Sequence, residues 1–179
     1  LVADASANVG GDRYGPYEPQ RTLRVDYSAY GPCDMLARHP HDQGVLMGGV
    51  GVLDALPGEV DAVVSLCRIG DEQVPARVRR EDRVEAWLID RETGVENPSL
   101  SFVLEQAADA VAEFRAEGRT VLLHCVQAQS RTPTVAALYA ARHRGVDVDD
   151  ALAAVCAALP GASPNRAFRN ELAQLGGAR

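Results

Sequence analysis

One stretch of the sequence constrains the fold most. The short apolar run Thr120 to His124 (TVLLH) passes directly into a loop, Cys125 to Arg131, and then into a helical pattern over 132–144 that Gly145 ends. A continuous apolar run of this length is typical of a strand buried on both faces. A strand, a tight loop and the first turn of a helix aim several backbone N–H groups at one point. The sequence therefore predicts a place that binds phosphate.

The remaining patterns place strands early in the chain and helices late. We expect strands at 21–27, 44–50, 61–66 and 84–89, a short helix at 53–56, and helices at 100–117, at 148–159 and from Ser163-Pro164 to about 175. Strand–helix alternation in the middle of the chain favours an α/β fold with a central, mostly parallel sheet and helices on both faces.

The domain boundary is expected near residue 20. Residues 1–20 are rich in Gly, Asp, Pro and Tyr and show little periodicity, which predicts a flexible arm or linker. Residues 21–179 are long enough to bury a core of their own, so we expect one folded domain there.

Charge and cysteine spacing exclude several classes of function. A net charge of −7 argues against general nucleic-acid binding. No apolar run is long enough to span a bilayer, and no secretory signal is visible, so a cytoplasmic location is expected.

The chain has four cysteines and no CxxC pair: Cys33, Cys67, Cys125, Cys156. This spacing favours free thiols over a disulfide framework or a metal site. Cys67 and Cys156 stand in apolar stretches and are expected in the core. His39 and His41 lack a third ligand and are expected in a solvated loop, so no metal or other cofactor is predicted.

The predicted loop carries chemistry at its two ends. Helix N-termini and arginines favour the thiolate form of a cysteine, so Cys125 is the candidate nucleophile. The guanidinium fork of Arg131 can bind two phosphate oxygens. The five intervening residues let the loop wrap one phosphate: Val126, Gln127, Ala128, Gln129, Ser130.

The segment HCVQAQSRT resembles the His-Cys-x5-Arg-Ser/Thr signature of the protein tyrosine phosphatase superfamily, and the chain is most similar to its small dual-specificity branch. Gly44 to Leu66 resembles the first strand, turn and buried strand of that branch. Ser163 to Leu172 resembles its closing helix, so about 135 residues, 44–179, follow the pattern. The resemblance implies hydrolysis of phosphomonoesters through a cysteinyl-phosphate intermediate without a cofactor.

The family's general acid is an aspartic acid upstream of the loop, and the matching position is Asp90, 35 residues before Cys125. That separation is a few residues longer than is usual in the branch, which suggests a small insertion at 94–98. Three other carboxyl groups compete for the assignment: Asp82, Glu92, Glu96. We expect Trp87 to pack in the core or against a loop near the acid.

The resemblance also implies supporting residues. His124 would lie behind the loop and steady the surroundings of the thiolate. Thr132 resembles the family hydroxyl that donates to the sulfur. Ser130 and Asn165 would support the loop by hydrogen bonds, although an Asn at a helix start also serves as an ordinary cap.

The loop interior departs from the family pattern. The branch usually has Ala-Gly where this chain has Gln127 and Ala128, and the missing glycine would strain the loop if the position requires a positive φ. The two glutamines are neutral, whereas basic residues in this loop accompany inositol or RNA polyphosphate substrates in relatives. Their absence favours a simple phosphomonoester.

Several functions remain open at this stage. A phosphorylated protein or a small phosphomonoester is the expected partner. The same chemistry could act on a nucleotide, an RNA end or a phospholipid headgroup, and the altered loop also suits a non-catalytic phosphate-binding module. A sulfurtransferase or arsenate reductase is disfavoured, because low-molecular-weight relatives carry the loop near the N-terminus. The sequence does not indicate an oligomeric state.

Overall fold

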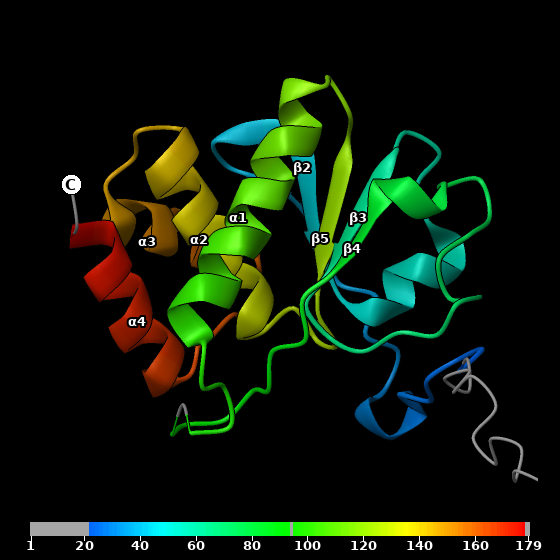
Figure 1. Ribbon diagram of the computed structural model, residues 1–179, viewed down its shortest axis with the longest axis horizontal. Coiled ribbons are helices and arrows are strands. Elements are labelled where there is room, and N and C mark those ends of the chain that lie inside the picture. Colours follow the sequence, from blue (N-terminus) through cyan, green and yellow to red (C-terminus); the bar gives the residue numbers. More distant parts are fainter. Residues whose placement is uncertain (1–21, 94, 178–179) are drawn as a thin grey trace, which may run out of the picture.

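The computed structural model describes residues 22–93 and 95–177 and contains a five-stranded sheet in the order β1-β2-β5-β3-β4 (Figure 1). The strands are β1 (Leu36–His39), β2 (Asp42–Gly48), β3 (Ala62–Ser65), β4 (Arg83–Glu85) and β5 (Val121–His124). β1 and β2 form an antiparallel hairpin, whereas β2, β5, β3 and β4 are all parallel. The predicted mostly parallel sheet is confirmed.

Buried side chains alternate between the two faces of this sheet. On β2, Val45 and Met47 belong to one core cluster and Leu46 belongs to the other. On β5, Val121 and Leu123 belong to the first cluster, and Leu122 belongs to the second. Because successive side chains of a strand point to opposite faces, these runs of apolar residues bury the central strands on both sides.

The α-helices of the described residues lie on one side of the sheet (Figure 1). They are α1 (Leu100–Ala116), α2 (Arg131–His143), α3 (Val148–Ala158) and α4 (Arg166–Gly177). The second face is covered by the 3-10 helix η2 (Val50–Ala55) and by apolar residues of the segment 67–78. Helices therefore flank the sheet as predicted, but the second face carries a short 3-10 helix in place of α-helices.

Residues 22–27, within the predicted strand 21–27, are not a strand, and that prediction is wrong. The backbone of this segment instead accepts hydrogen bonds from Asp71 N at Thr22 O (3.0 Å) and from Glu72 N at Leu23 O (3.0 Å), before the 3-10 helix η1 (Ser28–Tyr30). The segment is thus tied to a loop and not to the sheet.

The last helix begins later than predicted. Asn165 Oδ1 accepts a hydrogen bond from Phe168 N at 2.9 Å, so Asn165, not Ser163, caps the first turn. Ser163 N is used elsewhere, donating to Gln129 O at 2.6 Å. The helix therefore starts at Arg166, two residues after Pro164.

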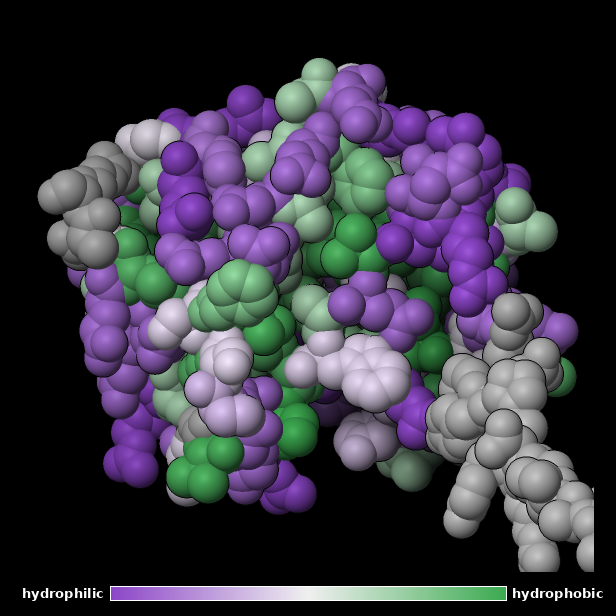
Figure 2. Space-filling model, viewed as in Figure 1, coloured by the Kyte–Doolittle hydropathy of each residue, from purple (hydrophilic) through white to green (hydrophobic). Residues whose placement is uncertain are grey.

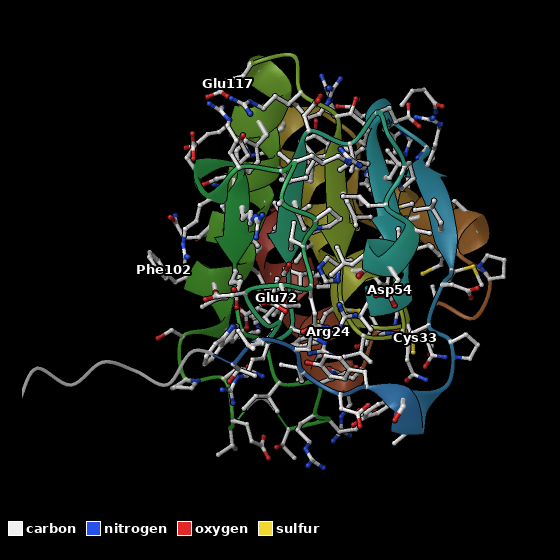
Figure 3. All side chains as sticks on the ribbon, turned by 90° about the vertical axis from the view of Figure 1, so that its right-hand side faces the viewer. Arg24, Cys33, Asp54, Glu72, Phe102 and Glu117 are labelled. Atoms are coloured by element: carbon white, nitrogen blue, oxygen red, sulfur yellow. The ribbon has the colours of Figure 1, made fainter. Side chains whose placement is uncertain are left out.

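The predicted arm at 1–20 lies outside the described residues. Within the described ranges, no helix is both long and apolar enough to cross a membrane. The surface over the α-helices is largely hydrophilic, with apolar side chains between the polar ones (Figure 2). Phe102 on α1 points away from the molecule (Figure 3).

Candidate active site

The loop between β5 and α2 lies at the carboxyl ends of the parallel strands, which is where ligand sites form in open α/β sheets. It forms part of a pocket of about 580 Å³. The pocket is lined by Tyr27, Tyr30, Cys67, Arg68, Trp87, Leu88, Ile89, Asp90, Arg91, Cys125, Val126, Gln127, Gln129, Ser130 and Arg131. The structure thus brings the three predicted catalytic residues, Asp90, Cys125 and Arg131, into one cavity.

Cys125 is held at the end of β5, where its side chain is only 2% exposed. Its N–H donates to Gly48 O at 3.4 Å, and its carbonyl accepts from His124 Nδ1 at 3.2 Å. Since a carbonyl only accepts, Nδ1 carries the proton and His124 Nε2 accepts from the Ser65 hydroxyl at 2.7 Å. Burial lowers the pKa of His124 to about 4, so the imidazole is neutral at pH 7.

The loop is also supported by neighbouring backbone. Val50 N donates to Val126 O at 2.9 Å, and Asn165 N donates to Ser130 Oγ at 3.0 Å. Gly49 allows this close approach, because a Cβ there would lie 2.2 Å from Cys33 O and 2.9 Å from Val126 O. The turn after β2 thus fixes the start of the loop, and the start of α4 fixes its end.

Ala128 occupies the position where the family usually has glycine, and its φ is +57°. The condition for strain is therefore met, because a side chain disfavours the left-handed region. Ala128 is buried in the core cluster beneath the loop. The apolar contact of its methyl group offsets part of the free-energy cost of the left-handed backbone conformation.

Arg131 closes the loop at the first position of α2. Its Nη1 donates to Leu88 O at 2.9 Å and to Leu66 O at 3.3 Å. Its Nε is buried and has no hydrogen-bond partner within the described part of the chain. A buried donor without a partner is costly, and an anion in the pocket would satisfy it.

The loop that carries Asp90 is fastened on both sides. Asn97 Oδ1 accepts from Ile89 N at 2.9 Å and Asn97 Nδ2 donates to Ile89 O at 2.8 Å. Asn165 Nδ2 donates to Asp90 Oδ1 at 2.7 Å, and Arg166 N donates to Glu92 Oε2 at 3.0 Å. Sequence reasoning missed Asn97, because no local pattern marks an amide that clamps a distant backbone.

The competing carboxyl groups do not line the pocket. Asp82 is buried and pairs with Arg79 and Arg119. Glu92 accepts from the backbone of α4, and Glu96 accepts from Thr93 Oγ1 at 3.0 Å. Asp90 is the one candidate of the four that faces the cavity.

Thr132 is buried, and its hydroxyl donates to Gly48 O at 3.5 Å. It forms no hydrogen bond with Cys125 Sγ in the described ranges. All four cysteines are free thiols. Among residues 22–93 and 95–177, no group of three or more His, Cys, Asp or Glu side chains could hold a metal ion.

Comparison with known proteins decides the family. The family model described as the dual specificity phosphatase catalytic domain matches residues 63–177. The chain belongs to the dual specificity phosphatase family. The phosphatase class predicted from the sequence, within the cysteine-based protein tyrosine phosphatase superfamily, is thereby confirmed.

Individual relatives agree with this assignment. Dual specificity protein phosphatase 1 of Arabidopsis thaliana is 31% identical over 80 residues, which are 45% of this chain and 40% of that protein. Human DUSP28 has a TM-score of 0.67 at 24% identity, covering 80% of this chain and 93% of that chain. A mouse putative dual specificity phosphatase complexed with zinc tungstate has a TM-score of 0.66 at 23% identity, covering 87% and 92%. The two structural similarities establish the fold of this phosphatase domain, and the curated relative is matched over less than half of its length.

Proposed function

We propose that the protein hydrolyses phosphomonoesters through a cysteinyl-phosphate intermediate formed on Cys125. The observation that carries the proposal is the meeting of Cys125, Arg131 and Asp90 in one pocket. The backbone of residues 126–130 and the unpartnered Arg131 Nε would bind the phosphate.

In the first step, the Cys125 thiolate attacks phosphorus, the S–P bond forms and the ester P–O bond breaks. The leaving oxygen takes its proton from the Asp90 carboxyl group. Arg131 and the loop N–H groups stabilise charge on the phosphoryl oxygens, which is the principal way in which proteins accelerate phosphoryl transfer. A positioned acid of this kind contributes about 10²–10⁴-fold.

In the second step, a water molecule attacks phosphorus and gives its proton to the Asp90 carboxylate. The P–S bond breaks, and Cys125 leaves as a thiolate while inorganic phosphate is released. We assign Thr132 as the hydroxyl that donates to the departing sulfur, which requires it to leave Gly48 O. His124 would act by fixing the Cys125 carbonyl.

The expected substrate is a tyrosine-phosphorylated protein or a small phosphomonoester. Aromatic side chains at the pocket wall support an aryl leaving group: Tyr27, Tyr30, Trp87. The same chemistry on a nucleotide, RNA end or phospholipid headgroup is the alternative. The neutral side chains of Gln127 and Gln129 favour the first reading over the second, and the net charge of −7 disfavours nucleic acid. The cytoplasm remains the predicted location.

A substrate panel tests the proposal. We expect hydrolysis of p-nitrophenyl phosphate that vanadate inhibits and that Cys125→Ser abolishes. Phosphotyrosine peptides should be turned over better than nucleotides, RNA ends or phospholipids. Binding of vanadate without turnover would identify a non-catalytic phosphate-binding module and would refute the proposed reaction.

A further inference from the structure

We propose that Arg68, stacked on Trp87 at the pocket rim, recognises a second negative charge of the substrate, carried by an acidic side chain next to the phosphorylated residue. The inference rests on the proposed function and names the substrate feature that this pocket selects. It concerns the exposed, aromatic rim of the pocket where Arg68 lies, and not the phosphate-binding loop at the floor.

Arg68 lies in the loop that follows β3, after Leu66 and Cys67, and lines the pocket. Its guanidinium lies over the Trp87 ring, 5.5 Å from the centroid, and its Nη2 donates to Thr22 Oγ1 at 3.0 Å. Tyr27 Oη donates to Arg68 O at 2.5 Å. Both the backbone and the head group of Arg68 are therefore positioned before any ligand arrives, which reduces the entropic cost of binding.

The platform beneath Arg68 is itself fixed. Trp87 is 61% exposed, and its Nε1 donates to Glu85 Oε2 at 2.7 Å. The segment that begins at Thr22 is attached to the loop after β3, because Thr22 O and Leu23 O accept hydrogen bonds from Asp71 N and Glu72 N. Arg24 and Glu72 accordingly lie close together (Figure 3). An exposed indole held in place gives a guanidinium a flat surface without neutralising it.

The charge of Arg68 is not compensated within residues 22–93 and 95–177. Several other arginines of the described residues pair with carboxylates: Arg24 with Asp54, Arg38 with Glu59, Arg80 with Asp71, Arg119 with Glu117, Arg142 with Glu105. Arg68 forms no such pair in the described ranges. Glu85 accepts a hydrogen bond from the indole N–H of Trp87 and forms no ion pair with Arg68. The positive charge of Arg68 is thus available to a ligand.

The cation on the aromatic surface, Arg68, suits a peptide with an acidic neighbour better than a polyphosphate. The loop side chains that face the pocket, Gln127 and Gln129, are neutral, so a sugar bearing several phosphates would meet few counter-charges there. Arg91 is the other rim cation, and it adjoins Asp90. Substitution of Arg91 therefore tests whether the preference for an acidic neighbour belongs to Arg68 or to the other rim arginine.

The experiment compares phosphotyrosine peptides that differ only in Glu, Gln or Lys beside the phosphorylated residue. In the wild-type protein, kcat/KM should be about two- to five-fold higher with Glu than with Gln, the range of exposed ion pairs. Arg68→Gln should bring the ratio to about one, and Arg68→Glu should reverse it. Arg80→Gln, which removes the same charge from a residue outside the pocket, should keep the ratio. At about 1 M salt, where the Debye length is about 3 Å, the preference should disappear.

Three outcomes overturn the inference: a wild-type ratio of one, a ratio that survives Arg68→Gln, or a ratio that is lost in Arg91→Gln and kept in Arg68→Gln. Faster turnover of inositol polyphosphates than of every peptide also overturns it. If the wild-type protein fails to hydrolyse p-nitrophenyl phosphate, the proposed function fails instead. Fluorescence anisotropy with the same peptides then decides the subsite, since a Glu-to-Gln binding ratio that depends on Arg68 supports it and a ratio of one refutes it.

Discussion

The side-chain amide of Asn165 donates a hydrogen bond to the carboxylate of Asp90 at 2.7 Å, although the two residues are 75 positions apart. The orientation of this amide is fixed from its other end, because Oδ1 accepts the capping bond from Phe168 N. The backbone N–H of the same residue donates to Ser130 Oγ. One residue at the start of α4 therefore connects the candidate acid with the candidate phosphate loop.

This relationship predicts a separable effect on catalysis. Asn165→Ser keeps a capping oxygen but removes the donor to Asp90, so we expect thermal stability to change little and kcat to fall about ten-fold, the equivalent of one hydrogen bond to a charged group. The loss should be greater for an alkyl than for a p-nitrophenyl ester, because a poor leaving group depends more on protonation. Asn170→Ala, at an exposed position of α4, is the control and should change neither quantity. Equal losses for both esters would show that Asn165 does not position the acid.

Burial of His124 predicts a dependence of stability on pH. The pKa of His124 is about 4 in the folded protein against an ordinary value of 6.5, so between these two values the unfolded chain binds the extra proton. The free energy of unfolding should therefore fall as pH drops from about 6.5 to about 4, by up to roughly 3 kcal/mol from this group.

Denaturant unfolding across that pH range measures the effect. Burial lowers the pKa of His39 as well, so the informative quantity is the difference between the wild-type protein and His124→Asn. The slope should decrease by about one proton in His124→Asn. An unchanged slope would contradict a neutral, buried His124.

The positive φ of Ala128 predicts a steep dependence on the side chain at that position. Ala128→Val should cost about 2 kcal/mol or more, because a β-branched residue is strained in the left-handed region and this site is buried. Ala128→Gly should stay within about 1 kcal/mol of the wild-type protein, since relief of backbone strain offsets the lost methyl contact. Calorimetric melting of both variants checks the pair, and equal stability of Val and Gly would refute the conformational account.

Much of the fold and the centre of the candidate site could be predicted, because the sequence patterns that mark them lie in unbroken stretches of the chain. The strand, loop and helix around Cys125 occupy one stretch, and the helices show clear apolar periodicity. β1 could not be predicted: its four residues have a mostly exposed burial pattern, and pairing with β2 in a hairpin makes them a strand. Segment 22–27 alternates like a strand but finds no partner strand.

Residues that act through distant contacts were also beyond prediction. His39 was expected in a solvated loop but is fully buried, where its ring contacts Ala136 O at 3.0 Å. Trp87 was expected in the core or against a loop, yet it stands on the rim, because Leu88 takes the inward position beside it. The acid candidate could be placed by resemblance, whereas its fastening by Asn97 depends on the folded geometry.

The central claim is that Cys125 becomes phosphorylated during turnover, and rapid mixing with p-nitrophenyl phosphate tests it most directly. In Asp90→Asn, a good leaving group departs without the acid but water activation is lost, so a phosphorylated intermediate should accumulate. Acid quenching and mass spectrometry should then find one phosphoryl group on the peptide that contains Cys125, with a burst of p-nitrophenol equal to the enzyme. Release of p-nitrophenol by Cys125→Ser at the wild-type rate would contradict the account.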